Sequence, residues 1–220
     1  LAAAGMEPTV FHMNEGHSAL LVLERLCAIT SGGGMTLAAA TEQVVASTVF
    51  TTHTPVPAGN ETFDPELARS YLEPLAGAAG MTWGDLVALA SHPDEAATDF
   101  GMTPLALRTS GFANGVAALH GDTSRRMWRG LWPDLPIDEV PITSITNGIH
   151  TPSWLSREMH ELLDRYIGPG LRERPEDPTV WERADTIPAG ELWRGHEGRG
   201  GGPVVFARAR LQARPAPHGP

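Results

Sequence analysis

Residues 47–59 have the sequence STVFTTHTPVPAG, in which a run of β-branched and aromatic residues passes directly into a segment with two prolines and a glycine. β-branched and aromatic residues favour strands, whereas proline and glycine end them. Residues 47–52 are therefore predicted to form a strand that is followed by a stiff loop. His53 stands at the carboxyl end of that strand, where the loop begins.

Strands and helices are predicted to alternate on both sides of this segment. Residues 9–13 (TVFHM) and residues 141–146 (PITSIT) have strand composition. Helices are predicted from the spacing of apolar residues and from cap signatures such as Asp64-Pro65. Because the connecting loops are short, the alternation indicates an α/β fold with a parallel sheet built from βαβ units. The helices are expected at residues 18–30, 36–46, from 64 onward, 82–90, 104–110 and from 151 onward.

Composition limits the classes of protein to which the chain can belong. Its 220 residues are 41% hydrophobic, which suffices for one domain, or for one domain and part of another. The formal net charge of -10 argues against a nucleic-acid partner, because such binding depends on clustered cations. No run of about 18 apolar residues and no leader sequence is present, so we expect a soluble cytoplasmic protein without a membrane partner. The single cysteine, Cys27, is expected to be structural, and a first residue other than methionine suggests that the true start is missing.

The character of the sequence changes near residue 156, beyond which it is helical in pattern and rich in charge. Residues 198–203 contain four glycines, which would end any helix begun at Ala189. The chain therefore divides into a first domain, the start of a second, helical one, and a tail that we expect to be disordered. The three parts are residues 1–155, 156–213 and 214–220.

The first polar cluster, His12-Met13-Asn14-Glu15-Gly16-His17, follows the first predicted strand. A zinc site on one helix needs two histidines at positions i and i+4, but His12 and His17 are five apart and Gly16 interrupts the helix. A metal site is therefore not expected. From residue chemistry alone, the cluster is either a strand end whose histidines bond to the backbone or a site for a polar ligand.

Two further polar clusters follow the other predicted strands. His53 lies between threonine hydroxyls on the proline-bounded loop, and Asn147 precedes Gly148, which permits a close approach of the backbone. The His53 cluster is weak evidence on its own, and the Asn147 cluster is equally typical of an ordinary turn. In parallel α/β sheets, however, ligands bind beyond the carboxyl ends of the strands, which is where all three clusters are expected.

Four segments of the sequence stand in an order and spacing that resemble those of one protein family. They are FHMNEGHSALL at residues 11–21, STVFTTHTPVPAG at 47–59, ANGVAALHG at 113–121 and ITNGIHTPSWL at 145–155. Together they resemble the α-glucan phosphorylases of glycogen, starch and maltodextrin metabolism, in particular the bacterial branch, and the likeness covers residues 8–213. Two stretches depart from the family pattern: TSGF at 109–112, where a more basic helix end is expected, and the glycines of 198–203.

The resemblance implies a fold of the GT-B type, with a cleft between two Rossmann-like domains. Residues 1–155 would be the C-terminal portion of the N-terminal, glucan-binding domain. Residues 156–213 would be the first helices of the C-terminal domain, which binds pyridoxal phosphate. The chain would then be an internal fragment of a longer phosphorylase, and any oligomer formation or allosteric regulation would belong to the full-length protein.

The resemblance also implies an activity and roles for individual residues. The family passes a glucosyl unit between an α-1,4-glucan, or a maltooligosaccharide, and inorganic phosphate, with pyridoxal phosphate contributing its phosphate group. His53 matches the active-site histidine, whose main-chain carbonyl faces the charge that develops on the sugar and whose ring bonds the 6-hydroxyl. Asn147 would share recognition of that hydroxyl, Glu15 would orient the His53 ring, and His17 and Asn14 would belong to the sugar site.

The sequence contains no lysine, and this absence limits what the chain can do alone. Pyridoxal phosphate is anchored in this family by a Schiff base, which requires a primary amine. We therefore expect no cofactor-binding residue in this chain and an inactive fragment. Three alternatives stay open: a maltooligosaccharide-binding remnant without catalysis, an unrelated metallohydrolase, and a glycosyltransferase that uses a nucleotide sugar on the same architecture.

Overall fold

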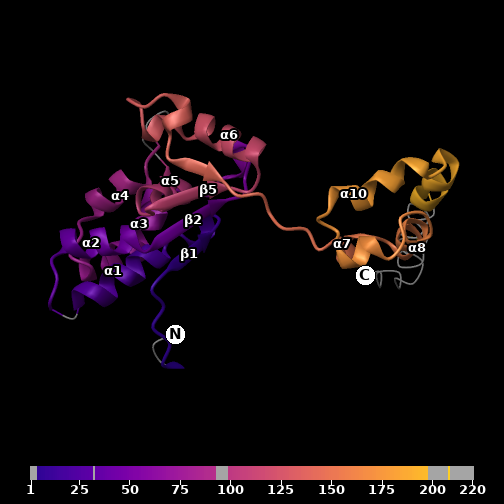
Figure 1. The fold of residues 1–220 in the computed structure, drawn as a ribbon. Coiled ribbons are helices and arrows are strands. Elements are labelled where there is room, and N and C mark those ends of the chain that lie inside the picture. The colour runs from indigo at the N-terminus through magenta and orange to yellow at the C-terminus, as the bar shows by residue number, and fades with distance from the viewer. Residues whose placement is uncertain (1–3, 32, 93–98, 198–207, 209–220) are drawn as a thin grey trace, which may run out of the picture. The chain divides into compact units, whose positions relative to one another are not determined.

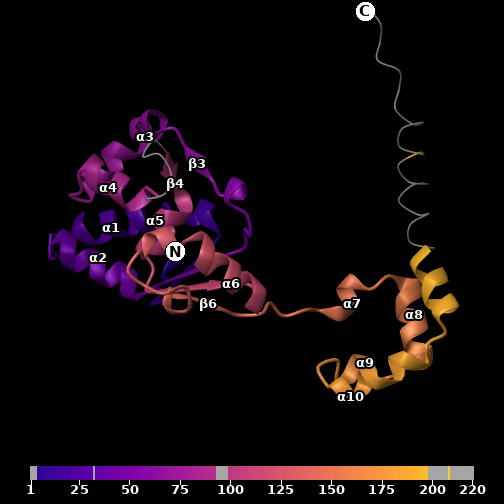
Figure 2. The ribbon, with the colours of Figure 1, turned by 90° about the horizontal axis from the view of Figure 1, so that it is seen from above.

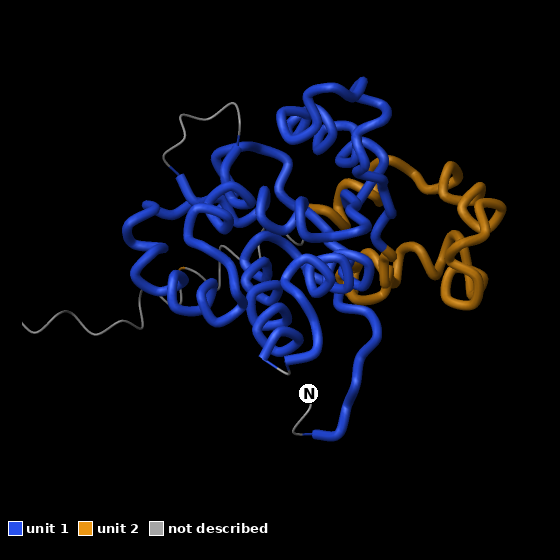
Figure 3. Tube along the Cα trace, turned by 90° about the vertical axis from the view of Figure 1, so that its left-hand side faces the viewer, with its two compact units in different colours: residues 1–147 blue, residues 148–220 orange. Residues whose placement is uncertain are grey.

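The computed structural model describes residues 4–31, 33–92, 99–197 and 208. The chain forms two compact units, residues 1–147 and residues 148–220, which are coloured separately in Figure 3. Unit 1 contains the sheet, and unit 2 is helical where it is described. The sequence placed the change of domain between residues 155 and 156, whereas the compact units divide between residues 147 and 148.

Unit 1 is built on a parallel sheet of four strands in the order β1-β2-β5-β6 (Figure 1). The prediction of an α/β fold with a parallel sheet is therefore confirmed. The predicted strands at 9–13, 47–52 and 141–146 correspond to β1, β2 and β6. The strands are β1 (Phe11–Asn14), β2 (Thr48–Thr52), β5 (Phe112–Gly115) and β6 (Ile142–Ser144).

Strand β5 was not predicted, because its sequence FANG holds two residues, asparagine and glycine, that are rare in strands. It forms because β2 and β6 pair with it on both sides, so that its backbone N–H and C=O groups are satisfied by two neighbours. Pairing within the folded sheet thus overrides a weak local preference.

Two helices of unit 1, α3 and α4, begin where the sequence predicts them, whereas α6 was not predicted. The Asp64 carboxylate accepts hydrogen bonds from the N–H groups of Glu66 and Leu67, and Thr82 and Asp85 form a reciprocal capping box. Two short strands, β3 (Thr62–Phe63) and β4 (Phe100–Gly101), form an antiparallel pair near α4 (Figure 2). The helices are α1 (Leu21–Ser31), α2 (Leu37–Ala46), α3 (Pro65–Ala78), α4 (Trp83–Ala90), α5 (Met102–Arg108) and α6 (Ala118–Met127).

The core of unit 1 lies against one face of the sheet. Met13, Phe50, Ala113 and Ile142 stand side by side in the strand register, and all are buried. They belong to one apolar cluster with buried residues of α1 to α5 and with Trp128, which follows α6. Since side chains alternate across a strand, this row places the residues between them on the opposite face.

Unit 2 has a smaller core formed by Leu163, Ile167, Leu171 and Val180. Its helical character agrees with the pattern predicted beyond residue 156. Residues 189–197 are also helical, and the glycines of 198–203 and the tail at 214–220 lie outside the described residues. Among the described helices, none is long and apolar enough to cross a membrane. The helices of unit 2 are α7 (Thr151–Trp154), α8 (Arg157–Tyr166), α9 (Gly170–Glu173) and α10 (Pro178–Trp181).

Gly115 provides a test of how closely α6 packs on the sheet. A Cβ atom at Gly115 would lie 2.9 Å from both the backbone nitrogen of Gly121 and Nδ1 of His120. Because the backbone would have to move, Gly115→Ala should lower the free energy of unfolding by about 1–3 kcal/mol in urea titrations. Gly77→Ala is the control: Gly77 lies within α3 with open space around it, and the change should raise stability by about 0.5–1 kcal/mol. Equal effects of the two substitutions would contradict this packing.

Candidate active site

The four parallel strands end at the same edge of the sheet, and the polar residues predicted from sequence lie there. Glu15 follows β1 directly and His53 follows β2. Asn147 comes shortly after β6, and its N–H donates to the carbonyl of Val116, the residue that follows β5, at 3.1 Å. Neighbouring strands are about 4.8 Å apart, so the edge gathers groups from distant parts of the chain into one short arc.

Glu15 and His53 are joined by a direct hydrogen bond. Oε2 of Glu15 accepts from the main-chain N–H of His53 at 2.7 Å and from the hydroxyl of Thr54 at 3.0 Å. Oε1 accepts from the N–H of Gly16 at 3.1 Å. One carboxylate therefore fixes the beginning of the His53 loop to the end of β1.

The role of Glu15 differs from the one expected. We predicted that its carboxylate would orient the ring of His53, but the contact is with the main chain of that residue. A peptide N–H held in this way fixes the plane of the Thr52–His53 peptide and restricts the backbone that carries the His53 carbonyl. The His53 residue itself is exposed at the sheet edge.

The backbone of Glu15 is strained. Its φ of 70° and ψ of 165° fall in a region that is essentially restricted to glycine and costs about 1–3 kcal/mol. The conformation is held by the carboxylate contacts and by a hydrogen bond from the Glu15 N–H to the carbonyl of Thr51 at 2.9 Å. Among the described residues, Glu15 is the only one other than glycine with a positive φ. Strain at a strand end is typical of a functional site.

Asn60 fastens the far end of the His53 loop, and sequence reasoning did not identify it. Its Nδ2 donates to the carbonyls of Val56 and Pro57 at 3.1 and 3.3 Å, and its Oδ1 accepts from the hydroxyl of Thr103 in α5 at 3.0 Å. An asparagine after Pro-Ala-Gly is the one sequence feature that could have suggested this turn-closing role.

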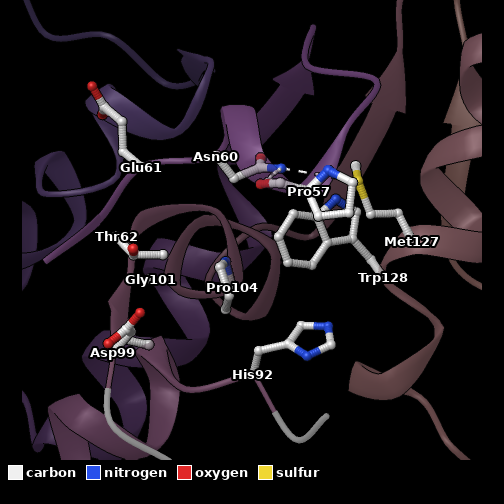
Figure 4. Close-up of a pocket in the computed structure, with 11 residues that line it drawn as sticks. Pro57, Asn60, Glu61, Thr62, His92, Asp99, Gly101, Pro104, Met127 and Trp128 are labelled. Carbon is white, nitrogen blue, oxygen red and sulfur yellow. Dashed lines mark hydrogen bonds between the residues drawn. The ribbon is translucent and has the colours of Figure 1, made fainter. Parts of the chain in front are cut away.

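A pocket of about 240 Å³ lies beside Asn60 (Figure 4). The carboxylate of Glu61 points away from it in Figure 4, and the amide of Asn60 is engaged by the contacts described above. The pocket is therefore lined by residues that hold the His53 loop in place, such as Asn60. It is lined by Pro57, Asn60, Glu61, Thr62, Ala90, His92, Asp99, Gly101, Pro104, Met127 and Trp128.

The remaining candidates of the first cluster are distributed around the end of β1. Asn14 is the last residue of β1 and is exposed, and His17 is exposed in a 3-10 turn formed by Gly16–Ser18. His12 bonds the hydroxyl of Thr51 through Nε2 at 2.7 Å. Within the described ranges, no group of three or more histidine, cysteine or acidic residues is arranged to hold a metal ion.

Cys27 lies away from this edge and makes a structural contact. Its thiol donates to the carbonyl of Leu75 in α3 at 3.2 Å. Burial, and secondarily the charge of Glu24, raises the pKa of the Cys27 thiol. A raised pKa disfavours the reactive thiolate, which agrees with a structural role.

Comparison with known proteins identifies the chain's relatives. It is 39% identical over 201 residues to a maltodextrin phosphorylase from Thermococcus litoralis, a match that covers 89% of this chain and 23% of the relative. It is 40% identical over 193 residues to a glycogen phosphorylase from Mycobacterium tuberculosis, covering 84% of this chain and 22% of the relative. The chain belongs to the α-glucan phosphorylase family.

A third phosphorylase, from Aquifex aeolicus, is 28% identical over 196 residues, which are 89% of this chain and 28% of that protein. The phosphorylase chain thus spans less than a third of the length of each of these relatives. No family model matches it. The four segments that suggested the family from sequence lie at the carboxyl ends of the four parallel strands, so family likeness and site geometry coincide.

Glu15→Gln tests whether the carboxylate holds the His53 loop. A glutamine side chain has one carbonyl oxygen in place of two carboxylate oxygens, and hydrogen bonds to a charged group contribute about 1.5–3 kcal/mol against about 0.5–1.5 for neutral ones. We expect the amide hydrogen of His53 to exchange about 5–30 times faster, as measured by NMR.

Glu73→Gln is the matched control, because Glu73 is an exposed residue of α3 that forms an ion pair with Arg69. It should leave the exchange of the His53 amide unchanged. Unaltered protection in Glu15→Gln would show that the loop is held by other contacts.

Proposed function

We propose that this chain is part of an enzyme that transfers a glucosyl unit from an α-1,4-glucan to inorganic phosphate, giving glucose 1-phosphate. The observation that supports it best is the hydrogen bond from the main-chain N–H of His53 to the Glu15 carboxylate, in a chain that is 39% identical to a maltodextrin phosphorylase. This hydrogen bond restrains the backbone of the residue to which the resemblance assigns catalysis.

In this proposal the carbonyl of His53 faces the positive charge that develops on the sugar. A dipole that is already oriented stabilises such charge without reorganisation during the reaction. The Glu15 carboxylate accepts hydrogen bonds from the main-chain N–H of His53 and from the hydroxyl of Thr54. Pro55 restricts the backbone of Thr54 further. The loop is therefore rigid on both sides of the proposed catalytic carbonyl.

The other site residues are proposed to recognise the sugar. The ring of His53 and the amide of Asn147 would bond the 6-hydroxyl, and His17 and Asn14 would line the same sugar site. The hydrogen bond from Asn147 to Val116 keeps its backbone at the sheet edge, within the arc that begins at Glu15. Glucan and phosphate are the proposed partners, without a choice between glycogen, starch and maltodextrin.

The residues of this chain do not fit the covalent attachment of pyridoxal phosphate. A Schiff base requires a primary side-chain amine, and the sequence has no lysine. We propose that a longer phosphorylase supplies the cofactor site, that residues 156–213 begin its GT-B second domain, and that the 220-residue chain is inactive alone. A cytoplasmic location, oligomer formation and allosteric regulation belong to the same proposal.

A non-catalytic maltooligosaccharide-binding chain is the second candidate. One feature favours it: every residue proposed to contact sugar is present, whereas the cofactor lysine is not. The two candidates differ in measurable ways. Binding of maltoheptaose without any dependence on phosphate would favour the second, and phosphorolysis by a longer protein containing this chain would favour the first.

Asn147→Ala tests the proposed sugar contact in a phosphorylase-length protein that contains this chain. An unpaired hydroxyl in a dry site costs about 1–3 kcal/mol, so kcat/KM for phosphorolysis should fall about 5–150-fold. Gln43→Ala, which removes an exposed amide of α2, should leave kcat/KM unchanged. Full activity of Asn147→Ala would show that Asn147 does not contact the sugar.

The absence of lysine leads to a separate expectation for the 220-residue chain by itself. Incubated with glycogen, phosphate and pyridoxal phosphate, it should release no glucose 1-phosphate above the level of a blank without protein. Reduction with borohydride should leave no pyridoxyl group on a side chain, as judged by mass spectrometry. Measurable turnover by the 220-residue chain alone would refute the proposal that a longer phosphorylase supplies the cofactor site.

A further inference from the structure

His120, a buried residue of α6, is linked to the candidate active site through the backbone of Val116. Val116 follows β5 directly, and its carbonyl accepts a hydrogen bond from the N–H of Asn147 at 3.1 Å. The N–H of Val116 donates to Nδ1 of His120 at 3.2 Å. Because these two backbone groups lie on either side of one Cα atom, the two hydrogen bonds together restrict both backbone dihedral angles of Val116.

Asn147 lies in a segment that has no helix or strand of its own. Residues 145–150, between β6 and α7, are exposed and irregular. Two backbone hydrogen bonds attach this segment to the end of β5. The N–H of Ile145 donates to the carbonyl of Gly115 at 3.0 Å, and the N–H of Asn147 donates to the carbonyl of Val116. The position of Asn147 therefore depends on the direction of the Val116 carbonyl.

His120 takes part in the capping of α6. Ala117, the residue before the helix, has no side chain that can accept a hydrogen bond, and His120 is the third residue of the helix. In a capping box, the third residue accepts a hydrogen bond from a backbone N–H at the start of the helix. Here the imidazole accepts the N–H of Val116, so that the same contact attaches the start of α6 to the end of β5.

The hydrogen bond defines the state of the imidazole. Nδ1 can accept only in a neutral ring that carries its proton on Nε2. Nε2 is buried and has no hydrogen-bond partner among the described residues. A buried donor without a partner is costly, so packing alone would favour an apolar side chain at position 120. The contact between Nδ1 and Val116 explains why a histidine can be accommodated there.

Two glycines allow this part of α6 to lie close to both strands. A Cβ atom at Gly115 would be 2.9 Å from Nδ1 of His120, and one at Gly121 would be 2.9 Å from the Cβ atom of Ser144. Closely packed interiors resist rearrangement. The imidazole is therefore held in a fixed position against the ends of β5 and β6.

We propose that His120 is a positioning residue of the candidate active site. Its Nδ1 fixes the N–H of Val116, and the carbonyl of Val116 in turn holds Asn147 where the side-chain amide can reach the sugar. This inference rests on the proposed function, in which Asn147 contacts the sugar. It adds that the contact depends on a buried imidazole that does not itself touch the sugar.

His120→Leu and His120→Asn form a matched pair of variants in a phosphorylase-length protein that contains this chain. Their side chains have nearly the same shape, but only asparagine places an acceptor at the position of Nδ1. In His120→Leu the backbone amide hydrogen of Asn147 should exchange about 2–13 times faster, as expected for the loss of a neutral hydrogen bond. In His120→Asn it should exchange at close to the unmodified rate. Hydrogen–deuterium exchange resolved to single amides by mass spectrometry measures both.

Kinetics test whether His120 acts through Asn147. In His120→Leu, kcat/KM for phosphorolysis should fall about 2–13-fold, and His120→Asn should restore it. Residues that act through one contact do not have additive effects. The double variant His120→Leu/Asn147→Ala should therefore be no slower than Asn147→Ala. Additive losses would show that His120 acts independently of Asn147 and would overturn the proposal.

Ser124→Ala is the control for the packing of α6. Ser124 lies one helical turn after His120 and is fully buried. The change should leave both the exchange of the Asn147 amide and kcat/KM unaltered. Equal effects of Ser124→Ala and His120→Leu would assign those effects to the packing of the helix and would overturn the proposal.

His120→Asn decides the question if His120→Leu does not fold. Faster exchange of the Asn147 amide in a folded His120→Asn protein would contradict the proposal, because the acceptor is still present, and an unmodified rate would support it. Failure of the proposed function has a different signature. Asn147→Ala would then leave kcat/KM unchanged, while exchange of the Asn147 amide would still respond to His120→Leu.

Discussion

The parallel pairing of four strands is the constraint on which the rest of this structure depends. It places every carboxyl end at one edge of the sheet, so that residues as far as 63 positions apart, such as Thr51 and Asn114, become neighbours. It also sorts each strand into a core face, with the row from Met13 to Ile142, and an opposite face that carries Phe112. The candidate site and the core are both consequences of that one arrangement.

At the sheet edge, the structure stabilises a backbone conformation that would not form alone. The strain at Glu15 costs about 1–3 kcal/mol, and hydrogen bonds to a charged acceptor contribute about 1.5–3 kcal/mol each. Three donors, from Gly16, His53 and Thr54, reach the Glu15 carboxylate and offset the strain. The balance explains why an acidic residue occupies a conformation that favours glycine, and it links the end of β1 to the start of the proposed catalytic loop.

The cofactor of the family requires a residue that this chain does not have. Its sequence has no lysine with which to form a Schiff base. This is explained if, as proposed, the chain works within a longer phosphorylase whose second domain supplies the cofactor site. The proposed sugar contacts and the proposed chemistry are then divided between separate parts of the fold.

The sequence by itself determined the α/β class, three of the four strands of the parallel sheet, the capped helices α3 and α4 and the family, because these depend on local composition, cap chemistry and short motifs. It also located Glu15, His53 and Asn147 at strand ends. Only the tertiary structure decided that FANG forms a central strand, that Glu15 holds the main chain of His53, and that Asn60 anchors the loop on α5. Each of these depends on hydrogen bonds between residues far apart in sequence. Glu15 and His53, for example, are separated by 38 positions. A local sequence pattern cannot predict which distant residues will form such a bond.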